Sequence, residues 1–122
     1  MRFFVDIDNT ISSSIRRNWH IDQIPKCEPY KLIKAISELY ENHTIIIYTH
    51  RNKKCATETI KWLKKHKVKY HKIIFNKPSW DLLIDDKTLP PYHFLNAKML
   101  EDYAEKIKKW NFDKGSFQLP KE

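Results

Sequence analysis

The sequence feature that most limits the possible fold is a short apolar run near the start that ends in two carboxylates. The chain reads Phe3-Phe4-Val5 and continues at once into Asp6-Ile7-Asp8-Asn9-Thr10. A run this short, with no helical period, is typical of a buried parallel strand. Open α/β sheets bind ligands just beyond the carboxyl ends of such strands. The pattern therefore predicts a strand from about Arg2 to Asp6, followed by a loop that can carry an active site.

The two carboxylates of this loop are spaced so that they can act together. Asp6 and Asp8 have the same parity in an extended chain, so both can face one side while Ile7 turns into the core. Two carboxylates side by side repel each other unless a cation holds them, and oxygen ligands suit Mg²⁺, which also takes phosphate as a ligand. The same residues also fit a strand end that runs into an Asx-type turn. The loop by itself leaves both interpretations open.

Length and composition favour one ordinary domain. The 122 residues, 41% of them hydrophobic, supply one core, and we expect a domain over residues 1–110 and a polar tail over 111–122. No apolar stretch approaches the roughly 18 residues that span a bilayer, and the start has no basic region with a cleavage site. We expect a cytoplasmic protein without membrane contact. Cys27 and Cys55 lack metal-ligand spacing and are expected to be reduced packing thiols.

The formal net charge of +8 raises the question of a nucleic-acid partner. Lysine dominates over arginine, isoleucine and asparagine are frequent, and glycine occurs once, which indicates a bias toward A/T-rich codons. We therefore interpret most of the charge as solvated surface that also attracts anionic substrates. The densest basic run, Lys61–Lys72, leaves a local anionic partner open.

The order of strand-like and helical segments predicts an α/β fold, with a parallel sheet flanked by helices. The β-branched run Thr44–Thr49 is the expected central strand. Tyr70–Phe75 and Leu82–Ile84 are the expected third and fourth strands. Helices are expected from Pro29 to Asn42-His43, from Ala56 to about His66, and over Ala97–Trp110, and a polar loop is expected over Ile11–Lys26.

Three of the expected strands end in residues suited to phosphate chemistry. In chain order these are Asp6 and Asp8, Thr49 with His50 and Arg51, Lys77 in the loop after the third strand, and Asp85 with Asp86. Because parallel strands end at one edge of a sheet, the residues should converge in one crevice. Each also has an ordinary explanation, as a strand-end hydroxyl, a solvated loop residue or the start of a turn.

Taken in order, Asp6–Thr10, Ile45–Thr49, Lys77 and Asp85–Asp86 resemble the motifs of the haloacid dehalogenase (HAD) superfamily of aspartate-nucleophile phosphohydrolases. The resemblance spans residues 2–87. Within it, the stretch from Lys77 to Lys87, with Tyr48-Thr49-His50-Arg51 before it, is similar to small capless members found in capsule and lipopolysaccharide biosynthesis clusters and in phage genomes.

The resemblance implies a Rossmann-like HAD fold and a Mg²⁺-dependent phosphomonoesterase. Asp6 would be the nucleophile that forms an aspartyl phosphate, and Asp8 would be the general acid and base. Thr49 and Lys77 would bind the transferring phosphoryl group. The implied Mg²⁺ ligands are Asp6, the backbone carbonyl of Asp8, Asp85 and, in support, Asp86.

The resemblance also implies a capless form, because residues 11–43 and 50–76 leave no room for a cap domain. An open cleft admits large substrates, or a neighbouring subunit completes it, so a homo-oligomer is left open. We expect five loop residues at the cleft to contact an anionic or sugar-bearing leaving group: His50, Arg51, Arg16, Arg17 and Trp19. His50 and Arg51 also fit plain exposed loop positions. Trp80 is expected to be a packing residue.

The leading hypothesis is hydrolysis of a small phosphorylated metabolite, such as a phosphosugar. Asn9 stands where the family often has glycine, and the position after His50-Arg51 also lacks it, which questions loop geometry more than reaction type. The alternatives are a phosphatase of nucleic-acid 3' ends, a basic binding module without turnover, and a phosphotransferase or mutase that shares the aspartyl phosphate.

Overall fold

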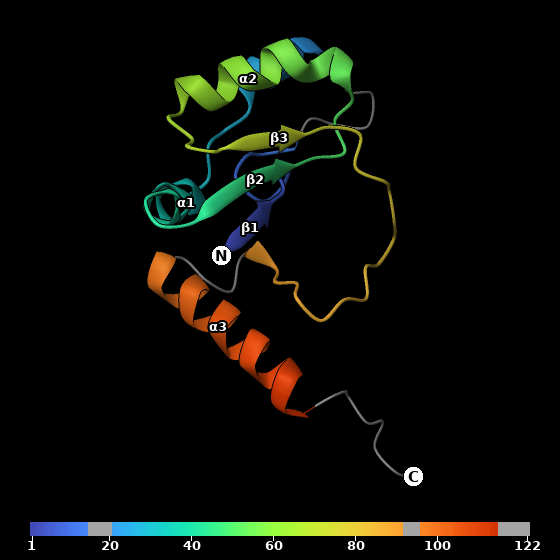
Figure 1. Ribbon diagram of the computed structural model, residues 1–122. Coiled ribbons are helices and arrows are strands. Elements are labelled where there is room, and N and C mark those ends of the chain that lie inside the picture. Colours follow the sequence, from blue (N-terminus) through green and yellow to red (C-terminus); the bar gives the residue numbers. More distant parts are fainter. Residues whose placement is uncertain (15–20, 92–95, 115–122) are drawn as a thin grey trace.

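The computed structural model describes residues 1–14, 21–91 and 96–114. Three strands, β1 (Arg2–Val5), β2 (Thr44–Tyr48) and β3 (Lys72–Ile74), form a parallel sheet with β2 in the middle (Figure 1). The first three expected strands are therefore confirmed, although β1 and β2 each end one residue early and β3 covers three of its six expected residues. Val5 pairs with Ile47, and Ile47 pairs with Ile73, so the three strands end near one edge.

The helices differ from the expected ones mainly at their ends. They are α1 (Leu32–Tyr40), α2 (Ala56–Lys65) and α3 (Ala97–Lys114), with two 3-10 turns, η1 (Ile21–Lys26) and η2 (Lys53–Cys55). Pro29 precedes α1 and instead bridges to Ser12. The helix α3 extends through part of the expected tail, whose residues 115–122 lie outside the described ranges. Among the described helices, none combines the length and apolarity needed to cross a bilayer.

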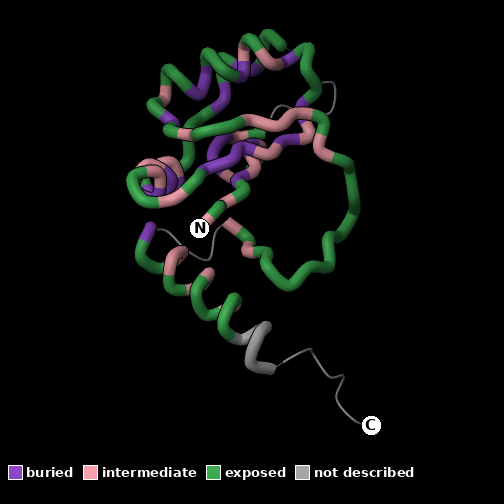
Figure 2. Tube along the Cα trace, in the orientation of Figure 1, coloured by how far each residue is buried: buried purple, intermediate pink, exposed green. Residues whose placement is uncertain are grey.

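The core is built on the central strand, as its β-branched sequence predicts (Figure 2). Ile45 and Ile47 are fully buried, and Trp62 and Leu63 of α2 lie in the same cluster. The indole N–H of Trp62 donates to the carbonyl of Cys27 at 2.9 Å, which satisfies the one polar group that this large ring buries. Ile60, also on α2, is exposed.

Both cysteines are free and buried, as expected of packing thiols. Burial raises the pKa of the Cys55 thiol, and the nearby Arg51 guanidinium opposes this shift in part. The thiol form of Cys55 is therefore favoured near neutral pH.

The expected polar loop over residues 11–26 is wrong in two places. Ile11 and Ile24 are fully buried in the core, and Ile24 belongs to η1. Single apolar residues among polar neighbours have no periodicity that could have indicated their burial. Arg16, Arg17 and Trp19 lie outside the described residues.

The expected fourth strand, Leu82–Ile84, is also wrong, since these residues form no strand. After β3, residues 78–91 leave the sheet as a long extended segment (Figures 1 and 2). Leu82, Leu83 and Ile84 are 77%, 43% and 90% exposed. Parallel neighbours need a crossover of about a dozen residues or more, and only residues 75–81 separate β3 from Leu82.

Candidate active site

The alternation of the first strand continues into the loop that follows it. Val5 and Ile7 are buried, whereas Asp6 and Asp8 are partly exposed. This arrangement confirms that the two carboxylates share one side of the extended chain while Ile7 enters the core.

Backbone hydrogen bonds hold this loop in a tight turn. The carbonyl of Ile7 accepts from the N–H groups of Thr10, Ile11 and Ser12 at 3.0, 3.0 and 3.1 Å. Asn9 adopts a left-handed backbone with φ of 62°, a conformation that asparagine tolerates better than most residues. The loop therefore has the conformation for which glycine is usual, with asparagine in its place.

Asp6 faces a cation and a hydroxyl. The ammonium nitrogen of Lys77 lies 3.4 Å from Oδ1 of Asp6, and the hydroxyl of Thr10 donates to Oδ2 at 3.4 Å. The side chain of Lys77 is 8% exposed, whereas that of Asp6 is 32% exposed. The structure thus brings Asp6 and Lys77 together and leaves part of the Asp6 carboxylate accessible.

Lys77 is held in place by its backbone and by two aromatic rings. Its N–H donates to the carbonyl of Thr49 at 2.9 Å, and its own carbonyl accepts from Nδ1 of His50 at 2.7 Å. The ammonium group lies 5.2 Å from the ring centre of Tyr48 and 5.1 Å from that of Trp80, within the range of cation–π attraction. Trp80 also packs edge-on against His50. These contacts aim the ammonium at the sheet edge.

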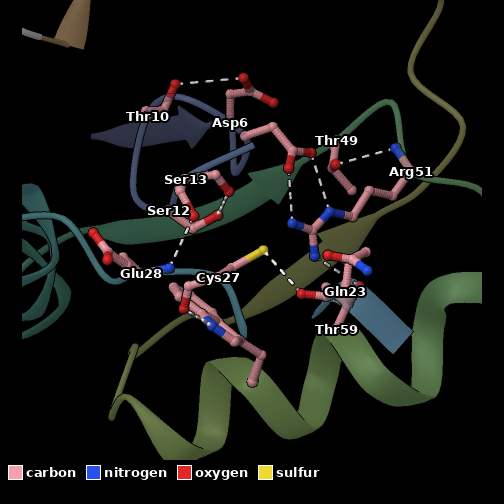
Figure 3. A network of polar contacts seen from close by, with 12 residues as sticks. Asp6, Thr10, Ser12, Ser13, Gln23, Cys27, Glu28, Thr49, Arg51 and Thr59 are labelled. Atoms are coloured by element: carbon pink, nitrogen blue, oxygen red, sulfur yellow. Dashed lines mark hydrogen bonds and ion pairs between the residues drawn. The ribbon is translucent and has the colours of Figure 1, made fainter. Parts of the chain in front are cut away.

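Arg51 is 1% exposed, so its interpretation as a plain exposed loop residue is wrong, and its contact with substrate stays a prediction. Its Nε and Nη2 donate to the two carboxylate oxygens of Asp8 at 3.0 and 2.8 Å, and its Nη1 donates to the hydroxyl of Thr59 at 3.1 Å (Figure 3). A guanidinium matches a carboxylate in this paired geometry. Arg51 therefore positions Asp8 from below the surface, while His50 stays partly exposed.

Thr49, at the end of β2, is fully buried. Its hydroxyl oxygen accepts from the backbone N–H of Arg51 at 3.1 Å (Figure 3). The hydroxyl hydrogen is not used in that bond. Thr49 thus lies beside the site, but it is covered in this conformation.

Asp85 and Asp86 lie on the exposed segment after β3 rather than at the sheet edge. A hydrogen bond from the side chain of Asp86 and another from the N–H of Lys87 hold the pKa of Asp85 below its usual range. Across the described residues, no three His, Cys, Asp or Glu side chains come together as metal ligands. The oxygen donors that Mg²⁺ prefers are thus divided between the first loop and the extended segment, and one copy does not assemble the predicted set.

Two contributors to this site were missed in the sequence. Thr59 lies in the middle of α2 and gives no sign of its contact with Arg51. Tyr48 is an ordinary aromatic residue at the end of a strand. Its contact with the Lys77 ammonium depends on the path of the loop after β3, which the sequence does not reveal. A partial signal existed for Arg51, because it stands two residues beyond the predicted strand end at the same sheet edge as Asp8.

Comparison with known proteins supports the fold. No family model and no curated protein matches the chain. A target protein from Vibrio cholerae of known crystal structure is similar, with a TM-score of 0.68 and 23% identity over 86% of this chain and 97% of that one. A share of 86% of 122 residues is about 105 residues, which is more than the chain contains up to Lys77. The likeness therefore includes part of the chain that follows the sheet.

Proposed function

We propose that the chain is a phosphomonoester hydrolase of the HAD type that acts through an aspartyl phosphate on Asp6. The observation that carries the proposal is the 3.4 Å approach of the Lys77 ammonium to Asp6, at the carboxyl ends of β1 and β2. Attack on a phosphate monoester needs an anionic nucleophile and a cation that offsets the charge of the transferring group. Asp6 and Lys77 supply both at the edge where parallel sheets bind ligands.

In the first step, an oxygen of Asp6 bonds to phosphorus as the bond from phosphorus to the ester oxygen breaks. Asp8 gives its proton to the departing oxygen. In the second step, water attacks phosphorus and gives a proton back to Asp8, and inorganic phosphate leaves Asp6. Because Arg51 binds both oxygens of Asp8, one of these bonds has to open for Asp8 to carry the proton, while the other keeps Asp8 oriented.

We further propose Mg²⁺ as the cofactor, since it would offset repulsion between the substrate phosphate and the carboxylates. Asp6 and the backbone carbonyl of Asp8 are the ligands that one copy offers. Proteins usually hold Mg²⁺ through one or two carboxylates, with waters and substrate phosphate in the other positions, so one copy offers the smaller of these carboxylate sets.

The carboxylate of Asp6 is partly exposed, so it can reach a phosphate group that projects from the end of a substrate molecule. A small phosphorylated metabolite such as a phosphosugar fits this requirement. The net charge of +8 supports a second candidate, the 3' phosphate of an oligonucleotide, because basic surface attracts polyanions.

The test is phosphate release from p-nitrophenyl phosphate, a panel of phosphosugars and a 3'-phosphorylated oligonucleotide, with Mg²⁺ or with a chelator. We expect release that depends on Mg²⁺ and that falls at least about a thousandfold in Asp6→Asn, because this change removes the nucleophile. Asp22→Asn, which alters an exposed carboxylate of η1, serves as the matched control and should keep full activity. Folded native protein that releases no phosphate from any of these substrates would contradict the proposal.

A further inference from the structure

The segment that follows β3 exposes more apolar surface than a folded chain of this size normally leaves unpartnered. Leu82 and Ile84 are 77% and 90% exposed, and Trp80 and Leu83 are each more than 40% exposed. Figure 2 shows the middle of the segment, residues 78–88, as exposed and away from the sheet. A contiguous apolar run of this kind marks an interaction site. Its sequence is that of a strand, and Asp85-Asp86 follow it just as Asp6 follows β1.

A matching edge exists in the same molecule. The sheet has the order β1-β2-β3, so within the described residues β1 pairs with β2 on one side and with no strand on the other (Figure 1). Phe4, in the middle of β1, is 54% exposed. An open edge presents unpaired N–H and C=O groups and is a template for another strand.

The chain cannot place Leu82–Ile84 on its own open edge. Lys77 is bound by its backbone to Thr49, beyond the end of β2, which leaves residues 78–81 as the connection. Leu82 would need to lie about 10 Å sideways and about 13 Å back along the sheet to stand beside Phe3. Five fully extended Cα steps span at most about 18 Å. The straight line of about 16 Å runs through β1 itself, and a path that passes over β1 is longer than the five steps can span. A second copy of the chain has no such limit.

We propose that two copies of this chain exchange these segments, so that Leu82–Ile84 of each copy adds as a fourth parallel strand to β1 of the other. The arrangement is reciprocal and closes with twofold symmetry. With Asp85 opposite Asp6, Leu82 and Ile84 fall opposite Phe3 and Val5.

This register agrees with the burial pattern of both segments. Phe3 and Val5 are the core-facing residues of β1, whereas Arg2 and Phe4 are exposed. Leu82 and Ile84, the two most exposed apolar residues of the segment, would thus join the core side, whereas the less exposed Leu83 would lie opposite Phe4. Period-two matching of this kind specifies a register, because a slip of one residue would reverse every side chain.

The exchange also completes the candidate site, a consequence that rests on the proposed function. Asp85 of the partner subunit would arrive at the carboxyl end of β1, beside Asp6. The carboxylates that one copy keeps apart would then meet at one edge, as oxygen ligands for Mg²⁺ must. Each of the two sites would contain a nucleophile from one copy and an acidic pair from the other.

Cross-linking tests the strand exchange independently of any activity. Phe4→Cys and Leu83→Cys are made in separate chains carrying tags of different size, refolded together and treated with a short bismaleimide. We expect a covalent heterodimer of about twice the 14.8 kDa chain mass. The matched control is a mixture of Leu83→Cys and Ile60→Cys chains, which should give no covalent heterodimer. Ile60 is exposed on α2. The native chain reports any reaction of the buried Cys27 and Cys55.

Three cross-linking results would contradict the strand exchange. No heterodimer from the first mixture, or an internal cross-link in a chain that carries both Phe4→Cys and Leu83→Cys, would show that the segment does not pair with the partner's β1. A heterodimer in the Ile60→Cys mixture as well would show unspecific contact and would also count against the proposal.

Complementation tests whether the exchange builds the site. Asp6→Asn and Asp85→Asn are each expected to be inactive. Refolded together, they should recover about a quarter of native activity, because half of the dimers are mixed and each mixed dimer has one intact site. If the cross-linked heterodimer forms but activity does not recover, the strands exchange and Asp85 of one copy does not contribute to the site of the other. This result would refute the shared site. Native protein that is inactive would refute the proposed function and leave the cross-linking result to decide the exchange.

Discussion

At the scale of single residues, each carboxylate of the first loop has its own cation. Lys77 lies against Asp6, and the buried Arg51 binds both oxygens of Asp8. Repulsion between two acids that are two residues apart is thus offset by side chains, a role that the sequence pattern suggested for a metal ion. This division gives the two acids different environments, since Asp6 stays accessible while Asp8 is oriented by a fixed fork of donors.

We expect Arg51→Ala to destabilise the fold by about 3 kcal/mol, because it leaves Asp8 without its paired donors and Thr59 without a partner for its hydroxyl. The measurement is urea unfolding followed by tryptophan fluorescence. Lys69→Ala is the control, since it breaks the exposed ion pair between Lys69 and Glu41 and should cost less than about 1 kcal/mol. Equal effects of the two changes would mean that the pair of Arg51 and Asp8 contributes no more than a surface contact.

At this scale the sequence predicted where residues lie along the chain better than where side chains point. The parity of Asp6 and Asp8 follows from strand geometry and is confirmed. The approach of Lys77 to Asp6 follows from the shared sheet edge. The burial of Arg51 could not be predicted in the same way, because a loop residue has no periodicity and its partner Thr59 comes from a helix.

At the scale of elements, a chain with one glycine has to end its helices and turns with other residues. The described residues that have positive φ and are not glycine are Asn9, Lys67 and Asn76. Lys67 follows α2 with φ of 57°. Its N–H bonds the carbonyl of Lys64, and the N–H of Val68 bonds that of Leu63, the paired bonds of a Schellman motif. Lysine here bears a steric cost that glycine would avoid.

We therefore expect Lys67→Gly to stabilise the protein by a few tenths to about 1 kcal/mol, since relief of the left-handed strain exceeds the entropy that glycine adds to the unfolded chain. Thermal unfolding by circular dichroism measures the change. Lys64→Gly is the matched control, because the same substitution within α2 should destabilise by about 1 kcal/mol. Loss of stability in Lys67→Gly would contradict the strain at this helix end.

The strands that were predicted correctly have both a strand-like sequence and a neighbouring strand with which to pair. Thr44–Tyr48 has a β-branched run and a neighbour on each side. Leu82–Ile84 has an equally strand-like composition, but composition states only that a segment can pair, whereas the length of the connection decides where. The short link after Lys77 was visible in the sequence and could have excluded a fourth parallel strand within one copy.

At the scale of the whole molecule, the proposed strand exchange ties stability to association. If Leu82 and Ile84 are buried only between copies, part of the apolar burial that stabilises each domain depends on protein concentration. We expect the midpoint of thermal unfolding to rise as the concentration of the native chain rises, and light scattering to give twice the 14.8 kDa chain mass.

The variant that separates this effect from ordinary stability is Leu82→Asp with Ile84→Asp. In one copy both residues are exposed, so a monomer should tolerate the change within about 0.5 kcal/mol. In an exchanged dimer the two carboxylates would be forced into the core side of the partner's sheet, where burying an unpaired charge is costly. We therefore expect a folded monomer whose unfolding midpoint is lower than that of the native chain and no longer depends on concentration. Lys87→Ala with Lys98→Ala makes the same change in net charge at exposed positions outside the proposed strand and should leave the dimer intact. A native midpoint that is constant over a hundredfold range of concentration, with a monomeric mass throughout, would contradict the dimer.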